Sequence, residues 1–167
     1  MFYYAGIGSR SAPRIILNSM KLIGGQMARL DYILRSGGAP GSDQYFELGC
    51  DILGGRKEIF IPWKGFEGNS NGIVPKFTDE LMSIAESYHP AWGHCSEGAR
   101  KLHARNVCQI LGANLDSPVD FVICWTKDGG FSGGTGQALR IADDYSIPIY
   151  NLFGNEDLMI LKDVLFP

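Results

Sequence analysis

The stretch FSGGTGQALRIA (residues 131–142) places three glycines, Gly133, Gly134 and Gly136, around Thr135, directly before a segment of helical character. Closely spaced glycines let the backbone approach a ligand, and the first turn of a helix offers unpaired N–H groups to an anion. A plain turn is the alternative. An apolar run precedes the stretch, and this order of strand, glycine loop and helix favours a phosphate cradle over a turn.

Two further glycine-rich segments follow predicted strands in the same way. AGIGSRSAP (residues 5–13) follows the first strand, and SGGAPGSD (residues 36–43) follows the second. All strands of a parallel sheet end at one edge, where open α/β sheets bind ligands. We therefore expect the three glycine loops to converge on one site.

Short runs rich in Ile, Val, Phe and Tyr alternate with segments of helical period, which is typical of a parallel α/β architecture. The expected strands are residues 2–7, 32–35, 58–62, 120–125 and 148–152. The expected helices are residues 13–30, 42–53, 76–87, 96–111, 135–145 and 155–164. The pattern predicts a Rossmann-like three-layer α/β sandwich with a mainly parallel sheet of about five strands, formed by residues 1–167 as a single domain. Residues 64–75 are predicted to form a loop beside the site.

Composition narrows the functional classes. The chain has 167 residues and a formal net charge of -3, so it has no global basic field to attract nucleic acid, although a local patch is compatible with it. Its four cysteines form no C-x-x-C pair, which favours free thiols in a reducing compartment. No segment has the pattern of a signal peptide or a membrane span, so we expect a cytoplasmic protein without a membrane partner.

Several common motifs are missing. The first glycine loop lacks G-x-G-x-x-G, and no Walker A motif or G-x-S-x-G elbow occurs. His89, His94 and Cys95 could ligate a metal, but their spacing fits no standard zinc pattern. The alternative is that this loop, with Trp92, lines a pocket by stacking on a base. We expect no metal and no cofactor.

The polar residues near the loops suggest specific roles. Ser9 and Arg10 are placed to reach a phosphate, although a helix cap with an exposed arginine is the alternative. Asp43 either caps a helix or holds ribose hydroxyls or acts as a base, and Glu47 lies one helical turn further on. His103 is more often a packed or exposed helical residue than a catalyst.

Five segments together resemble the SLOG superfamily, the Rossmann-like group that joins DNA-processing protein A with the LONELY GUY phosphoribohydrolases. They are YYAGIGSR (residues 3–10), LRSGGAPGSD (34–43), IFIPW (59–63), HARN (103–106) and GGTGQALRIADDYSIPIYNL (133–152). The resemblance implies a nucleotide-type ligand at the glycine loops. The ligand-binding residues that we expect are Gly8, Ser9, Arg10, Gly37, Gly38, Ser42, Arg105, Asn106, Gly133, Gly134, Thr135 and Gly136.

The sequence departs from the LONELY GUY pattern after the last glycine loop. Those enzymes carry a catalytic glutamate there, whereas this chain has Gln137 and no acid before Asp143. We therefore expect a domain that binds a nucleotide or a nucleotide-derived small molecule. Hydrolysis of a nucleoside monophosphate at its N-glycosidic bond is the alternative, and Asp43 or Glu47 would then be catalytic.

Binding of single-stranded DNA, as in DNA-processing protein A, is the third hypothesis. It requires a local basic patch, for which the candidate residues are Arg10, Arg35, Arg105 and Arg140. Because related domains often pair, we also expect a homo-oligomer.

Overall fold

The computed structural model describes residues 1–165, and the side chains of residues 1–163. Its five strands are β1 (Tyr3–Gly6), β2 (Ile33–Ser36), β3 (Lys57–Ile59), β4 (Phe121–Cys124) and β5 (Ile149–Asn151). They form one parallel sheet in the order β3-β2-β1-β4-β5. The order reverses beside β1, so the ends of β1 and β4 flank the crevice in which sheets of this type bind ligands.

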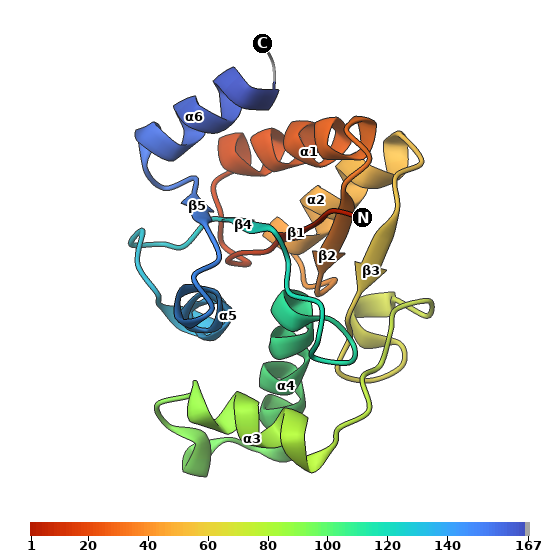
Figure 1. The fold of residues 1–167 in the computed structure, drawn as a ribbon, viewed down its shortest axis with the longest axis vertical. Helices are drawn as coiled ribbons and strands as arrows, with labels where there is room; N and C mark the ends of the chain where they lie inside the picture. The colour runs from red at the N-terminus through yellow and green to blue at the C-terminus, as the bar shows by residue number, and fades with distance from the viewer. Residues whose placement is uncertain (166–167) are drawn as a thin grey trace.

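Six helices cover both faces of the sheet (Figure 1). They are α1 (Arg14–Arg29), α2 (Ser42–Ile52), α3 (Asp79–Ser87), α4 (Glu97–Leu111), α5 (Gly133–Asp144) and α6 (Asn155–Leu165), with two short 3-10 turns, η1 (Phe66–Gly68) and η2 (Trp92–His94). Helices α1, α2 and α6 lie on one face, α4 and α5 lie on the other, and α3 packs against α4. The expected Rossmann-like three-layer sandwich is confirmed.

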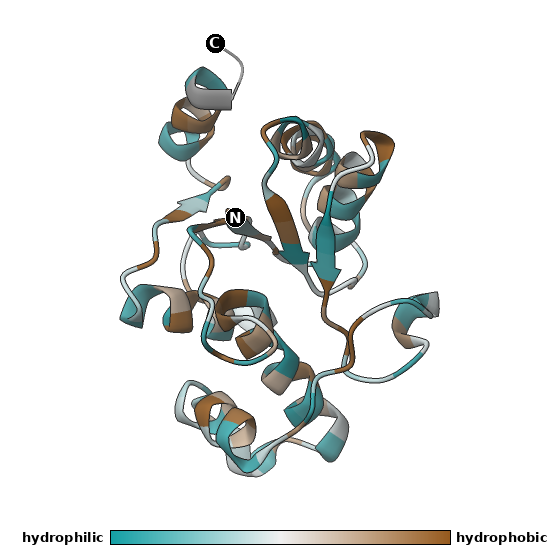
Figure 2. Ribbon diagram, turned by 45° about the vertical axis from the view of Figure 1, so that its right-hand side comes forward, coloured by the Kyte–Doolittle hydropathy of each residue, from teal (hydrophilic) through white to brown (hydrophobic). Residues whose placement is uncertain are grey.

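Each face of the sheet has its own core. Tyr4, Phe46 and Met27 belong to the core under α1 and α2, and Val122 and Leu139 belong to the core under α4 and α5. Figure 2 shows helices banded in brown and teal, as expected where one side faces a core and the other faces solvent. Within the described part of the chain, no helix combines the length and the apolar character needed to cross a membrane.

Helices α1 and α4 begin one residue later than predicted, and two other helices begin two or three residues from the predicted position, for local reasons. Helix α3 begins at Asp79 rather than at residue 76, because the Thr78 side chain accepts a hydrogen bond from the Leu81 N–H and caps the helix. Helix α5 begins at Gly133, with Ser132 before it, rather than at residue 135. The glycines of the opening stretch are therefore part of the first turn of α5.

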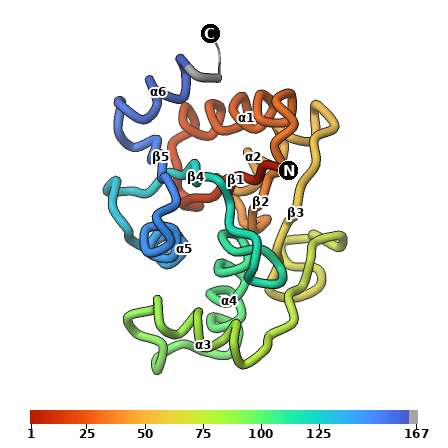
Figure 3. The backbone as a smooth tube through the Cα atoms, in the orientation of Figure 1, coloured from red at the N-terminus to blue at the C-terminus, as the bar shows by residue number. Residues whose placement is uncertain are grey.

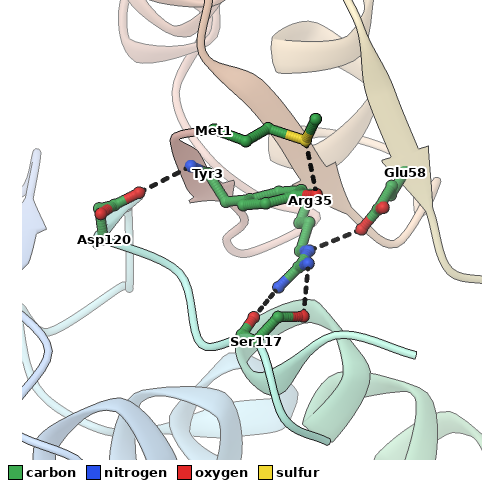
Figure 4. A network of polar contacts seen from close by, with 6 residues as sticks. All are labelled: Met1, Tyr3, Arg35, Glu58, Ser117 and Asp120. Carbon is green, nitrogen blue, oxygen red and sulfur yellow. Dashed lines mark hydrogen bonds and ion pairs between the residues drawn. The ribbon is translucent and has the colours of Figure 1, made fainter. Parts of the chain in front are cut away.

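Arg35 has a structural role that the sequence did not reveal (Figure 4). Its side chain is 2% exposed, its Nε donates to Glu58 at 2.7 Å, and its guanidinium donates to the carbonyl and the hydroxyl of Ser117. It also lies 4.0 Å from the ring centre of Tyr3. Arg35 thus joins the α4–β4 connection to the sheet, and its proposed place in a DNA-binding patch is wrong.

Candidate functional site

A cavity of about 590 Å³ opens at the carboxyl edge of the sheet. The connections β1–α1 and β4–α5 meet there, as the Ser9 N–H donates to the Trp125 carbonyl at 3.0 Å (Figure 3). The cavity is lined by both connections and by residues of α2, α4 and α5. Of the predicted ligand-binding or catalytic residues, it brings together Gly8, Ser9, Arg10, Asp43, Arg105, Asn106, Gly133, Gly134 and Thr135.

The first glycine loop forms one wall. A Cβ on Gly8 would lie 2.6 Å from the Ser42 hydroxyl, so this position has no room for a side chain. Ser42 does not line the cavity; its hydroxyl donates to the Ser9 carbonyl at 2.9 Å and holds the loop from behind. Arg10 is exposed and lies 3.3 Å from Glu67. That contact places the loop of residues 64–75 beside the site, as predicted.

The last glycine loop forms the opposite wall. Gly133, Gly134 and Thr135 are the first three residues of α5, and all three line the cavity. The N–H groups of these three residues lie in the first turn of the helix, where they have no carbonyl partner within the helix itself. Gly136 does not line the cavity, because its N–H already donates to the Ser132 carbonyl at 3.0 Å. The first turn of α5 therefore presents to the cavity a helix N-terminus of the kind that can bind an anion.

Arg105 brings a buried positive charge to the cavity. Its side chain is 6% exposed, and burial lowers its pKa. Nη1 donates to the Asn106 side-chain oxygen at 2.8 Å, while the buried Nε has no partner among the described residues. Arg105 also makes no ion pair within that part of the chain. Buried charges are normally paired, and the attraction of the nearby Asp43 carboxylate acts on Arg105 without a direct ion pair.

Gly37 and Gly38 do not line the cavity, and Gly37 lies against Arg105. A Cβ at Gly37 would collide with the guanidinium of Arg105, so the glycine provides the space in which that group lies. Gly38 has a backbone φ of 65°, a conformation that residues other than glycine rarely adopt. The turn that contains them is therefore shaped around the arginine.

Asp43 is the carboxylate of the site. It is 4% exposed, and its Oδ2 accepts a hydrogen bond from the Ala39 N–H at 3.3 Å. Burial raises its pKa to about 6, although the Arg105 charge and hydrogen bonds from backbone N–H groups act in the opposite direction. A carboxyl with this pKa can donate or accept a proton near neutral pH.

Glu47 does not share the site with Asp43. Its carboxylate accepts a hydrogen bond from the Lys57 ammonium at 2.8 Å, at the side of β3, and it does not line the cavity. One helical turn separates the two acids, but only Asp43 faces the edge of the sheet. The expectation that Glu47 could act in catalysis is corrected by this placement.

A hydrogen-bond network joins α4 to α5 behind the cavity. Asn106 Nδ2 donates to the Gly134 carbonyl and to Gln137 Oε1, each at 3.2 Å. Gln137 is fully buried, and its Nε2 donates to the Ala85 carbonyl at 2.8 Å. Gln137 Oε1 also lies 3.0 Å from His103 Nδ1, so this nitrogen is the donor and carries the proton. Burial lowers the pKa of His103, which favours its neutral form.

The cavity contains polar residues that were not predicted to bind a ligand. Thr126 and Lys127 follow β4 with only Trp125 between, and the carboxyl-edge rule would have identified them. His103 and Gln109 line the cavity together with Asn106. They lie three residues to either side of Asn106 on α4, so helical spacing from that residue would have found both.

The proposed arginine patch is not continuous. Arg140 donates from Nε to the Tyr88 carbonyl at 2.9 Å and from Nη1 to the Phe131 carbonyl at 3.1 Å. With Arg35 committed to Glu58 and Ser117, two of the four arginines hold loops in place. Arg10 and Arg105 line the cavity, and Lys127 is the further cation there.

His103 also belongs to a group of potential metal ligands. His89, Cys95 and His103 each offer a ligand atom, and these atoms lie within 4.8 Å of one another. The remaining histidine of the sequence, His94, is not part of the group.

Comparison with known proteins places this architecture among solved structures. No family model matches the chain. No curated protein sequence matches it either. The molybdenum cofactor carrier protein from Chlamydomonas reinhardtii is similar in structure, with a TM-score of 0.55 and 17% sequence identity over 98% of this chain and 85% of that one. A second structure of that carrier protein gives a TM-score of 0.54 and 16% identity.

DNA processing protein A from Helicobacter pylori is also similar in structure, with a TM-score of 0.55 and 14% sequence identity. The structure of that protein concerns its mode of binding single-stranded DNA. The match covers 90% of this chain and 64% of that protein. DNA-processing protein A is one of the two groups on which the SLOG resemblance rests. The chain therefore has the Rossmann-like fold predicted from that resemblance.

Proposed function

We propose that the cavity binds a nucleotide or a nucleotide-derived small molecule through its phosphate. The observation that carries this proposal is the buried Arg105, whose Nε has no partner among the described residues. Arg105 shares the cavity with the first turn of α5 at Gly133 and Gly134. A guanidinium and a helix N-terminus together are well suited to a phosphate group.

The cavity also suits the remainder of such a ligand. Its volume of about 590 Å³ lies within the range of small-molecule sites. Ala39, Leu102 and Ala138 give it apolar walls against which a base can pack, and Asp43 offers an acceptor for ribose hydroxyls. Of two proteins with this fold, one is a molybdenum cofactor carrier and the other binds single-stranded DNA, which supports ligand binding by a protein of this fold.

The test is calorimetric titration with inorganic phosphate, pyrophosphate and a panel of nucleoside mono- and diphosphates. Arg105→Met should weaken binding of the best ligand by about 10- to 100-fold, the worth of a charge-assisted hydrogen bond. Lys101→Met is the matched control, because it removes one positive charge from an exposed position on the same helix, where Lys101 pairs with Glu97. The proposal fails if no compound binds more tightly than about 1 mM, or if both substitutions weaken binding equally.

Hydrolysis at an N-glycosidic bond is the second candidate, and the pKa of Asp43 favours it. A carboxyl with a pKa of about 6 in a phosphate-binding cavity can protonate a leaving base or activate water. Release of free base from nucleoside monophosphates, followed by chromatography, measures this activity. Asp43→Asn should abolish it while Glu47→Gln leaves it unchanged, since Glu47 pairs with Lys57 outside the cavity. Activity that survives Asp43→Asn would refute this mechanism.

A further inference from the structure

Three potential metal ligands, all between residues 89 and 103, meet beside the cavity. His89 and Cys95 lie on the connection between α3 and α4, and His103 lies on α4. All three are partly buried, and one ligand atom from each lies within 4.8 Å of the others. Imidazole nitrogen and thiolate sulfur are preferred ligands of zinc. We propose that His89, Cys95 and His103 bind a zinc ion, with a fourth coordination position left for water or a ligand atom.

The orientation of His103 suits a metal ligand. Its Nδ1–H donates to Gln137 Oε1, so the free lone pair of the neutral ring is on Nε2. The direction of this bond is fixed from behind, because Gln137 donates its amide to Ala85 and is fully buried. Histidines that bind metals generally donate their second nitrogen to a fixed acceptor in this way.

The other two ligands are close to coordination geometry. Cys95 Sγ lies 3.8 Å from His89 Nδ1 and 3.9 Å from His89 Nε2. Tetrahedral zinc with ordinary bond lengths separates sulfur and nitrogen ligands by about 3.5 Å, so a movement of a few tenths of an ångström suffices. His89 Nδ1 accepts a hydrogen bond from the Ala91 N–H at 3.2 Å and is therefore unprotonated. Zinc would replace that local hydrogen bond, and the Cys95 thiol would release its proton to solvent.

Three protein ligands distinguish this site from a structural zinc site, which is closed by a fourth. His103 also lines the cavity, so the ion would lie at the cavity edge. His89 and Cys95 do not line that cavity, so substitutions at these two residues test metal binding separately from phosphate binding.

The experiment is titration of chelator-treated, full-length protein with Zn²⁺ in competition with a zinc-binding dye. The wild type should bind one zinc ion with a Kd below about 1 μM. Cys95→Ser and His89→Ala should each weaken binding at least about tenfold, while His94→Ala, in the same connection but outside the group, should not. Circular dichroism checks that each variant is folded.

Substitution with Co²⁺ gives an independent readout of the ligands. The wild-type complex should show a thiolate-to-cobalt charge-transfer band and the ligand-field bands of tetrahedral cobalt, and Cys95→Ser should remove the former. Equal zinc affinity in Cys95→Ser and His94→Ala would overturn the proposal. So would a cobalt complex without the thiolate band, because Cys95 would then not be a ligand. A band that appears reports Cys95, because the other cysteines, Cys50, Cys108 and Cys124, are buried and lie outside the group of potential ligands.

Discussion

The buried carboxyl of Asp43 should make the protein less stable as the pH rises. Its pKa increases from an ordinary value of 3.8 to about 6 on folding, so between these values the folded state binds more protons than the unfolded state. Stability then falls with rising pH across this interval. The difference between 3.8 and about 6, at about 1.4 kcal/mol for each pH unit, amounts to about 3 kcal/mol.

Asp43→Asn isolates this effect, because the amide oxygen can still accept from Ala39 but the side chain no longer ionises. Urea unfolding of both proteins from about pH 4 to about pH 7 measures the difference in the free energy of unfolding. Carboxylates elsewhere contribute equally to both proteins, and Arg105 stays charged throughout, so their effects cancel. The variant should gain about 2.4 kcal/mol relative to the wild type between the two ends of the range, because the unfolded carboxyl is already partly ionised at about pH 4. A difference in stability that does not change with pH would refute the reasoning.

Four further substitutions separate structural roles from ligand binding. Arg35→Met should lower the free energy of unfolding by about 3 to 5 kcal/mol without reducing phosphate affinity in the folded protein, as unfolding and calorimetry would measure. Gly49→Ala should cost about 1 to 3 kcal/mol in thermal unfolding, because its Cβ would collide with the Lys21 carbonyl where α1 and α2 touch; an unchanged Tm would contradict this contact. Gly133→Val should reduce both the stability and the phosphate affinity of the protein, since Gly133 has a φ of 62°. Gly134→Ala should reduce both by less, because the Cβ of the alanine would meet open space. Equal losses of stability and affinity in the two variants would contradict this account.

The sheet and the edge that carries the cavity follow from local sequence features. Apolar runs that end in glycine loops identify β1 and β4, and the parallel connection rule brings their carboxyl ends together. The rule also explains why Gly8 and Gly133 were placed at one site from sequence. The parallel connection rule depends on chain topology and not on side-chain packing. For that reason it predicts correctly that the loops after β1 and β4 lie at one edge of the sheet.

The features that sequence did not reveal depend on contacts between distant segments. Gly37 provides the space for Arg105, 68 positions further along the chain, and no local pattern identifies that pair. Glu47 was misplaced because a spacing of four residues puts it near Asp43 on the helix, whereas Lys57 draws its carboxylate toward β3. His103 joins His89 only because the α3–α4 connection folds back against α4.

Gln137 links the glycine stretch at the start of α5 to α3 and α4. Its amide donates to Ala85 while its oxygen accepts from Asn106 and His103, so every polar atom of this fully buried side chain is engaged. A glutamate here, as in the LONELY GUY enzymes, would place a carboxylate oxygen against the Ala85 carbonyl with no donor between them. Gln137 instead orients Asn106, whose amide holds both Gly134 and, through its oxygen, Arg105. The residue therefore fixes the guanidinium and the first turn of α5 relative to each other, which is the arrangement that a bound phosphate requires.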